Sequence, residues 1–297
     1  MGFTRREEFL WQLRSRSLAL GRRTLVMGVL NVTPDSFSND GLLGSAEAVD
    51  FALRLLDDGA DILDVGGEST RPGQRQRVSA DEEQARVLPV IEAVLKARPK
   101  TVISIDTYQA ATARAAMEAG AEIVNDVSGF LWDDAMAAAC AQLQCGVVLM
   151  HTRGKPDEWK SLPRLTADEV LPLVKRELGE RLQAALDAGL SRDRIVLDPG
   201  YGFGKRLEEN YPLLARQNEL RALGQPLLAG VSRKSFLGRA LRPLYGGVDA
   251  PVEKRLHATV AATVAAILNG ADIVRVHDVR PAVEATRIAD AVLGLAL

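Results

Sequence analysis

The chain has 297 residues, of which 47% are hydrophobic and 26% are charged, the composition of an ordinary soluble globular protein. Its formal net charge of −2 argues against binding to nucleic acid through bulk electrostatics, so we expect no nucleic-acid partner. The most apolar segment, residues 258–268, is too short and too rich in Ala to span a membrane. Cys140 and Cys145 have no further metal ligands nearby, and two reduced thiols suit a cytoplasmic location.

The first 23 residues are predicted to form a helical extension, and residues 24–297 to form a single larger domain. Glu7 and Glu8, followed by the periodic Phe9, Leu10 and Leu13, favour a short amphipathic helix packed on the fold.

An apolar run at residues 25–30 follows and is typical of a buried strand. It leads directly into a polar segment, LNVTPDSFSND, in which Pro34 biases Thr33 away from helix while Asp35 and Ser36 favour a turn. We expect this segment to be a loop that closes over a site at the end of the strand, because such lids are usually polar.

A repeated unit of helix, Gly, strand and polar tip organises the rest of the chain. Three copies are GADILDV at 59–65, GAEIVNDV at 120–127 and GADIVRVHDV at 270–279. In each, the Gly is placed as the residue that ends a helix with positive φ, and the β-branched run resembles a parallel strand buried on both faces. The other strands are expected at 25–30, 102–105, 147–150, 195–197 and 226–231, and the helices at 45–58, 81–97, 108–119, 132–142, 166–188, 208–223, 253–269 and 281–294.

Eight strands alternating with eight helices predict a (β/α)8 TIM barrel with eight parallel strands in a single domain. An open, doubly wound sheet is the alternative. In a barrel, the chemistry belongs at the C-terminal ends of the strands. The residues there are Asn31, 66–71, Asp106, Asn125, Asp126, His151, Asp198, 232–234, Arg275 and His277.

These polar strand ends divide into two chemical groups. Any one of them could be a helix cap, but caps are small polar residues rather than Lys, Arg and His. The acceptors Asp106, Asn125 and Asp198 suit a flat heterocycle with several N–H donors, such as a 2-amino-4-oxo-pyrimidine. The donors Arg71, Arg275 and His277 suit phosphate or diphosphate, and Lys234 could serve either group.

The glycine-rich segment GYGFGK, residues 200–205, is a weaker signal. It lacks the first Gly of a nucleotide-binding P-loop, and Arg206 replaces the Ser or Thr of that motif. Its glycines are expected to bring backbone close to a flat ligand or to form the turn. Asp126 could bind a metal ion or cap the following helix.

The motifs LNVTPDSFS, GGESTRPG, SIDT, NDVSG, LDPGYGFGK, GVSRKSFLG and VRVHD resemble, in order and spacing, those of the bacterial dihydropteroate synthase family of pterin-binding barrels. The resemblance covers residues 24–294. It implies a transferase that condenses 6-hydroxymethyl-7,8-dihydropterin diphosphate with p-aminobenzoate, giving 7,8-dihydropteroate and diphosphate in folate biosynthesis. It also implies Mg²⁺ as cofactor, a homodimer formed by helices of the later half, and the motif pattern of sulfonamide-sensitive members.

The resemblance implies a role for each matched residue. Lys234, Asp106 and Asp35 match catalytic positions, with Asp35 near the reacting carbon. The pterin-binding positions are Asp106, Asn125, Asp198 and Lys234; those for diphosphate are Asn31, Arg71, Arg275 and His277, with Asn31 also touching the metal; and those for p-aminobenzoate are Phe37, Thr70, Arg71, Pro72, Lys234 and Ser235.

Two departures from the family pattern leave these positions occupied. Thr152 and Arg153 follow His151 where the family more often has Met and a polar residue, and Asn39-Asp40 lengthens the first loop.

Two other functions fit part of the pattern. A methyltetrahydrofolate-dependent methyltransferase of the same barrel group would share Asp106, Asn125 and Asp198, but would have no use for a magnesium–diphosphate site or for Lys234-Ser235. A non-catalytic binding protein would keep the barrel without turnover. The occupancy of every matched polar position argues against this second alternative.

Overall fold

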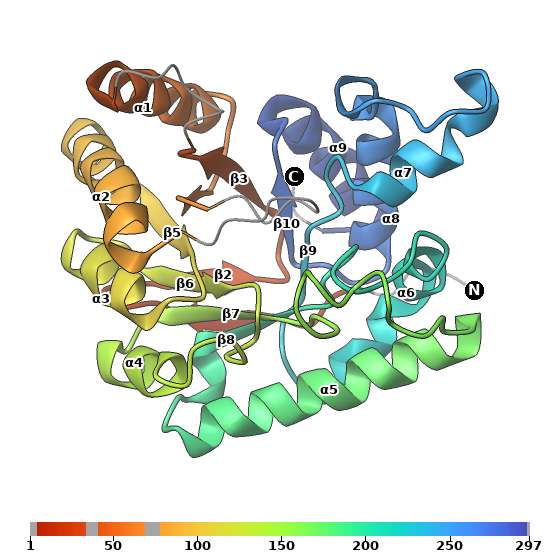
Figure 1. The fold of residues 1–297 in the computed structure, drawn as a ribbon, viewed down its shortest axis with the longest axis horizontal. Helices are drawn as coiled ribbons and strands as arrows, with labels where there is room; N and C mark the ends of the chain where they lie inside the picture. Colours follow the sequence, from red (N-terminus) through yellow and green to blue (C-terminus); the bar gives the residue numbers. More distant parts are fainter. Residues whose placement is uncertain (1–4, 34–40, 69–77, 296–297) are drawn as a thin grey trace.

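Eight parallel strands form a barrel at the centre of the computed structural model, which describes residues 5–33, 41–68 and 78–295 (Figure 1). The strands are hydrogen-bonded in the order β8-β7-β6-β5-β4-β3-β10-β9, and a parallel bridge between Leu197 and Leu227 joins the two ends of this sheet. The predicted (β/α)8 barrel is therefore confirmed over the open sheet. The strands are β3 (Leu25–Asn31), β4 (Ile62–Gly66), β5 (Val102–Asp106), β6 (Ile123–Asp126), β7 (Gly146–Met150), β8 (Ile195–Asp198), β9 (Leu228–Ala229) and β10 (Ile273–Val276).

Helices surround the barrel near the positions that the sequence predicts (Figure 1). The predicted helix 208–223 is α6 prolonged by a 3₁₀ segment at Gln217–Leu223, and a short helix after β9, α7, was not expected. The helices are α1 (Gly41–Asp57), α2 (Ala80–Ala97), α3 (Ala110–Glu118), α4 (Met136–Leu143), α5 (Ala167–Asp187), α6 (Asn210–Arg216), α7 (Ser235–Ala240), α8 (Leu256–Leu268) and α9 (Val279–Val292).

The repeated Gly has the conformation that the helix–Gly–strand unit requires. Gly59, Gly120 and Gly270 follow α1, α3 and α8 with φ of 102°, 106° and 94°. Residues with a Cβ are strained at such φ, and Gly ends a helix there without that cost. Each Gly therefore turns the chain from the outer helix into the next inner strand.

The predicted N-terminal helix is wrong. The segment forms an antiparallel hairpin of β1 (Phe9–Gln12) and β2 (Ser17–Leu20), with Phe9 opposite Leu20. Burial alternates with a period of two: Leu10 is 53% exposed, whereas Trp11 and Leu13 are 1% and 2% exposed. Their side chains join the cluster of apolar residues at the N-terminal ends of the strands, including Met27. The hairpin thus packs under the barrel, and this tertiary contact outweighs the weak helical pattern.

Across residues 5–33, 41–68 and 78–295, the longer helices are too polar, and the apolar ones too short, to cross a bilayer.

Candidate active site

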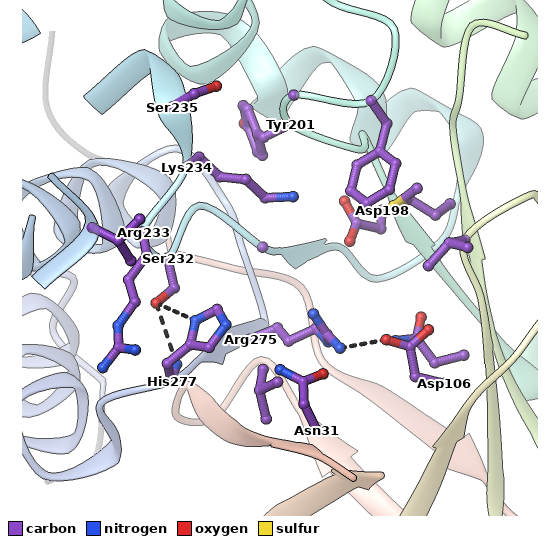
Figure 2. A pocket seen from close by; sticks show the side chains of 18 of the residues that line it. Asn31, Asp106, Asp198, Tyr201, Ser232, Arg233, Lys234, Ser235, Arg275 and His277 are labelled. Atoms are coloured by element: carbon purple, nitrogen blue, oxygen red, sulfur yellow. Dashed lines mark hydrogen bonds and ion pairs between the residues drawn. The ribbon is translucent and has the colours of Figure 1, made fainter. Parts of the chain in front are cut away.

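A cavity of about 270 Å³ opens at the C-terminal ends of the strands (Figure 2). Six strands or the loops after them bring the predicted residues into its lining. Asp35, Phe37, Thr70, Arg71 and Pro72 belong to segments outside the described residues. The predicted residues that line the cavity are Asn31, Asp106, Asn125, Asp198, Lys234, Ser235, Arg275 and His277.

Arg275 joins the acceptor side of the cavity through two carboxylates. Its Nε atom donates to Oδ2 of Asp64 and its Nη2 atom to Oδ2 of Asp106, both at 2.6 Å. The side-chain amide of Asn125 donates to the same Asp64 oxygen at 3.0 Å. The predicted separation of Arg275 from the acceptors is therefore too simple, because its guanidinium binds the predicted acceptor Asp106 as well as Asp64.

Asp64 is the residue of this network that the sequence analysis missed. It is completely buried in β4, and its Oδ1 atom has no partner among the residues that the structure describes. A buried carboxylate in an otherwise apolar strand is costly unless it is paired. The available signal was that Asp64 is the one charged residue within the apolar strand ILDVG.

The carboxylates of the cavity hold protons more tightly than free ones do. Burial raises the pKa of Asp106 to about 7, against the opposing effect of Arg275 and with a further contribution from Asp64. Burial would lower the pKa of Arg275, but the Asp64 and Asp106 carboxylates raise it above its usual range. Burial also raises the pKa of Asp198, whose Oδ1 accepts the Gly200 backbone N–H at 2.7 Å.

Lys234 lies at the start of α7, and its side chain projects into the same cavity as Asp198 (Figure 2). Its Nζ atom is 4.1 Å from the centroid of the Phe203 ring, a cation–π contact. Burial lowers its pKa to about 8, and the nearby Arg275 adds to this effect. The ammonium therefore rests on an aromatic face close to two acceptor carboxylates.

The other end of the cavity carries Asn31, His277 and Ser232. Both the backbone N–H and Nδ1 of His277 lie near Ser232 Oγ, at 3.2 and 3.0 Å. Arg233 has a φ of 58°, and its guanidinium is bound by Asp278 at 2.6 and 3.0 Å. Of the adjacent pair Arg233 and Lys234, Lys234 is thus the residue directed toward the acceptors (Figure 2).

The segment GYGFGK forms a tight turn around a buried lysine. Gly200 has a φ of 67°, and a Cβ there would lie 1.9 Å from the His151 carbonyl oxygen. Lys205 Nζ donates to the carbonyls of Gly200, His151 and Phe203 at 2.7, 3.3 and 3.3 Å. Burial lowers the pKa of this lysine to about 7. The expected turn is confirmed, whereas the role of Lys205 in tying together the loops after β7 and β8 was not predicted.

His151 and Asp126 have local partners rather than positions in the cavity lining. His151 Nε2 lies 2.9 Å from Glu177 Oε2, and burial lowers the pKa of its imidazole to about 4. The Asp126 carboxylate accepts the backbone N–H groups of Ser128 and Phe130 at 2.7 and 3.0 Å. Asp126 therefore organises the turn that follows β6.

The donor set at the Asn31 end fits Mg²⁺ held together with a substrate rather than a protein cage. Within the described ranges, no group of three or more His, Cys, Asp or Glu side chains is placed to hold a metal ion. Asn31 ends β3 and lines the cavity with a neutral amide. Mg²⁺ keeps several waters and commonly binds through one or two protein groups plus substrate phosphates, so a single Asn is compatible with it.

Comparison with known proteins assigns this site to a family. The profile of the family described as "Pterin binding enzyme" matches residues 27–277. Dihydropteroate synthase of Bacillus subtilis (strain 168) is 42% identical over 279 residues, which are 94% of this chain and 92% of the relative. The enzyme of Escherichia coli (strain K12) is 42% identical over 270 residues, 91% of this chain and 92% of that one.

Structures of related proteins share the fold. Xanthomonas albilineans dihydropteroate synthase with 4-aminobenzoic acid is 40% identical, with a TM-score of 0.86 over 98% of this chain and 100% of that one. The same organism's enzyme in complex with 7,8-dihydropteroate has a TM-score of 0.82 at 39% identity, over 97% and 100% of the two chains. The chain therefore belongs to the pterin-binding enzymes and, among them, to the dihydropteroate synthase family.

Proposed function

We propose that this chain is a transferase that condenses 6-hydroxymethyl-7,8-dihydropterin diphosphate with p-aminobenzoate to give 7,8-dihydropteroate and diphosphate. The observation that carries the proposal is the convergence of Asp106, Asn125 and Asp198 with Lys234 and Arg275 in one cavity. Relatives of known structure bind 4-aminobenzoic acid and 7,8-dihydropteroate.

The acceptor group, which consists of Asp106, Asn125 and Asp198, is proposed to bind the edge of the pterin that carries its N–H groups. Asp106 and Asp198 would accept from ring and amino N–H groups, and Asn125 offers both an oxygen and an amide. Charge-assisted bonds of this kind contribute about 1.5–3 kcal/mol each. The two carboxylates also favour positive charge on the ring, which stabilises the carbon as its bond to diphosphate breaks.

The arylamine nucleophile is neutral at pH 7, so the mechanism needs no general base to activate it. Lys234 is proposed as the residue that connects the two substrates, because its ammonium lies beside the acceptor group while Ser235 follows it at the rim of the cavity. Phe37, Thr70, Arg71 and Pro72 complete the proposed p-aminobenzoate site from the two loops, and Asp35 is proposed to lie near the reacting carbon.

The Asn31 end is proposed to bind the diphosphate. His277 and Arg71 would donate to its oxygens, Arg275 lies between this end and the pterin, and Asn31 would contact Mg²⁺. The ion would spread the negative charge that develops on the leaving diphosphate. Water must be kept from the electrophilic carbon during this step.

Sulfonamides are proposed to compete with p-aminobenzoate at this site. The structure of Yersinia pestis dihydropteroate synthase in a sulfonamide drug complex is 39% identical to this chain, with a TM-score of 0.86 over 95% of this chain and 98% of that one. The segment SRKSFLG includes Lys234 and Ser235, which line the cavity and would face the drug. Competitive inhibition against p-aminobenzoate, measured by initial rates, tests this proposal.

A homodimer in the cytoplasm is proposed on separate grounds. The packed pair α8 and α9 leaves Ala261, Ile288 and Val292 exposed, the last two at 67% and 54%. A second copy could cover this apolar face. Cys140 and Cys145 are free and buried, which suits a reducing compartment. The molar mass of the purified protein, measured by light scattering, would test the dimer. Ile288→Glu should shift that mass to the value of a monomer.

The decisive assay measures diphosphate release with and without p-aminobenzoate. We expect release only when pterin diphosphate, p-aminobenzoate and Mg²⁺ are all present. Release at the same rate without p-aminobenzoate would identify a hydrolase instead. Methyl transfer from methyltetrahydrofolate to a corrinoid would support the alternative methyltransferase.

A further inference from the structure

The loop after β7 carries an aromatic side chain to the cavity that no sequence motif identified. Trp159 lines the cavity together with Phe203. The two ring centroids are 5.4 Å apart and the ring planes make an angle of 82°, an edge-to-face contact. This is a favourable arrangement for an aromatic pair, so the two rings support each other at the edge of the site.

Two arginine side chains, hydrogen-bonded to backbone carbonyls, tie this loop to the turn that carries Phe203. The buried guanidinium of Arg153 donates to the Gly204 carbonyl at 3.1 Å and to the Pro163 carbonyl at 3.0 Å. Arg206 donates to the Leu162 carbonyl at 2.9 Å. Trp159 lies between these anchor points, so its indole is held against the Phe203 turn.

The same rings belong to an apolar wall of the cavity. Val127, Met150 and Phe203 form a buried cluster, and Trp159 packs against it. Asn125 is the second-last residue of β6 and Asp198 is the last of β8, and the segments after these two strands supply part of this wall. A planar heterocycle whose edge bonds to those residues would present a face to apolar and aromatic side chains. Stacking on aromatic side chains is a common way to bind flat nitrogen heterocycles.

We propose that Trp159 contacts the pterin ring and, with Phe203, selects a planar heterocycle on the pterin side of the cavity. This inference rests on the proposed function, since it assumes that the acceptor group binds a pterin. The apolar wall lies on the side of the cavity where the pterin ring is proposed to bind. Loss of Trp159 should therefore weaken pterin binding much more than binding of p-aminobenzoate.

The test compares two tryptophan variants of the full chain. Trp132 offers a matched control: it packs against the same buried cluster, with its ring 5.2 Å from that of Tyr108, but it does not line the cavity. The probe is 6-hydroxymethylpterin, titrated by calorimetry and by quenching of tryptophan emission. Trp159→Leu should bind the probe about tenfold more weakly and lose most of the quenching, because an aromatic contact is replaced by an aliphatic one.

Trp132→Leu should keep both the affinity and the quenching of the unchanged protein. Trp159→Phe should recover most of the affinity without the indole signal, which separates ring contact from a folding defect. Unchanged affinity and quenching in Trp159→Leu would overturn this inference alone. Failure of the unchanged protein to bind the pterin at all would overturn the proposed function, and this inference with it.

Discussion

Asp64→Asn isolates the charge of the buried carboxylate that shares Arg275 with Asp106. An Asn can keep an oxygen at the position that accepts from Arg275 and Asn125, so the change removes one negative charge with little change in shape. In the unchanged protein, Asp106 has a pKa of about 7. A pterin N–H needs the ionised form of this carboxylate as its acceptor.

The sign of the effect follows from this pKa. Pterin affinity should be constant above about pH 7 and should fall about tenfold per unit below it, as a proton must be removed before binding. Like charges about 4 Å apart repel by about 4 kcal/mol at an effective dielectric constant of about 20, and this is an upper figure here because Arg275 binds both carboxylates. Asp64→Asn should therefore lower the pKa of Asp106 by about one to two units.

Calorimetric titration with 6-hydroxymethylpterin between about pH 5.5 and pH 8 measures this shift. At pH 6 the unchanged protein should bind about tenfold more weakly than at pH 8, whereas Asp64→Asn should lose less than about threefold. Asp57→Asn is the charge-matched control, because that side chain is 67% exposed on α1. The reasoning is refuted if the fall in affinity has the same midpoint in all three proteins. Misplacement of Arg275 would instead weaken binding equally at every pH.

The remaining predictions concern the pterin edge, the buried lysine and the metal. Asp198→Asn should weaken pterin binding by about 1.5–3 kcal/mol in calorimetry, since a charged acceptor becomes a neutral amide; an unchanged dissociation constant would place the pocket elsewhere. Lys205→Met should lower the free energy of unfolding by about 2–4 kcal/mol because three buried carbonyls lose their donor, whereas the exposed Lys155→Met should not; equal urea midpoints would contradict this role. EDTA should abolish turnover and added Mg²⁺ should restore it, with binding of the bare pterin unaffected; loss of that binding would mean that the ion acts elsewhere than at the diphosphate.

The barrel could be predicted because its signals are local and repeated. Gly59, Gly120 and Gly270 each mark the passage from helix to buried strand, and the parallel topology then brings the strand ends together. Asp106, Asn125, Asp198, Lys234 and Arg275 were predicted to meet for this reason.

Contacts that depend on side-chain direction could not be predicted in the same way. Nothing local distinguishes Arg233, which turns to Asp278, from Lys234, which points toward Asp198. The sequence identified Asp64 only as a strand residue. Its partner Arg275 is 211 positions away, so no local pattern indicates their pairing. The N-terminal hairpin was missed because Trp11 and Leu13 find their apolar partners only once the barrel has formed.

Product identification tests the central claim most directly. Purified protein is incubated with Mg²⁺, 6-hydroxymethyl-7,8-dihydropterin diphosphate and isotopically labelled p-aminobenzoate, and the products are measured by mass spectrometry. The account predicts labelled 7,8-dihydropteroate and diphosphate in equal amounts, with both absent when p-aminobenzoate is omitted. Diphosphate release with unlabelled hydroxymethyl-dihydropterin as the only pterin product would contradict it.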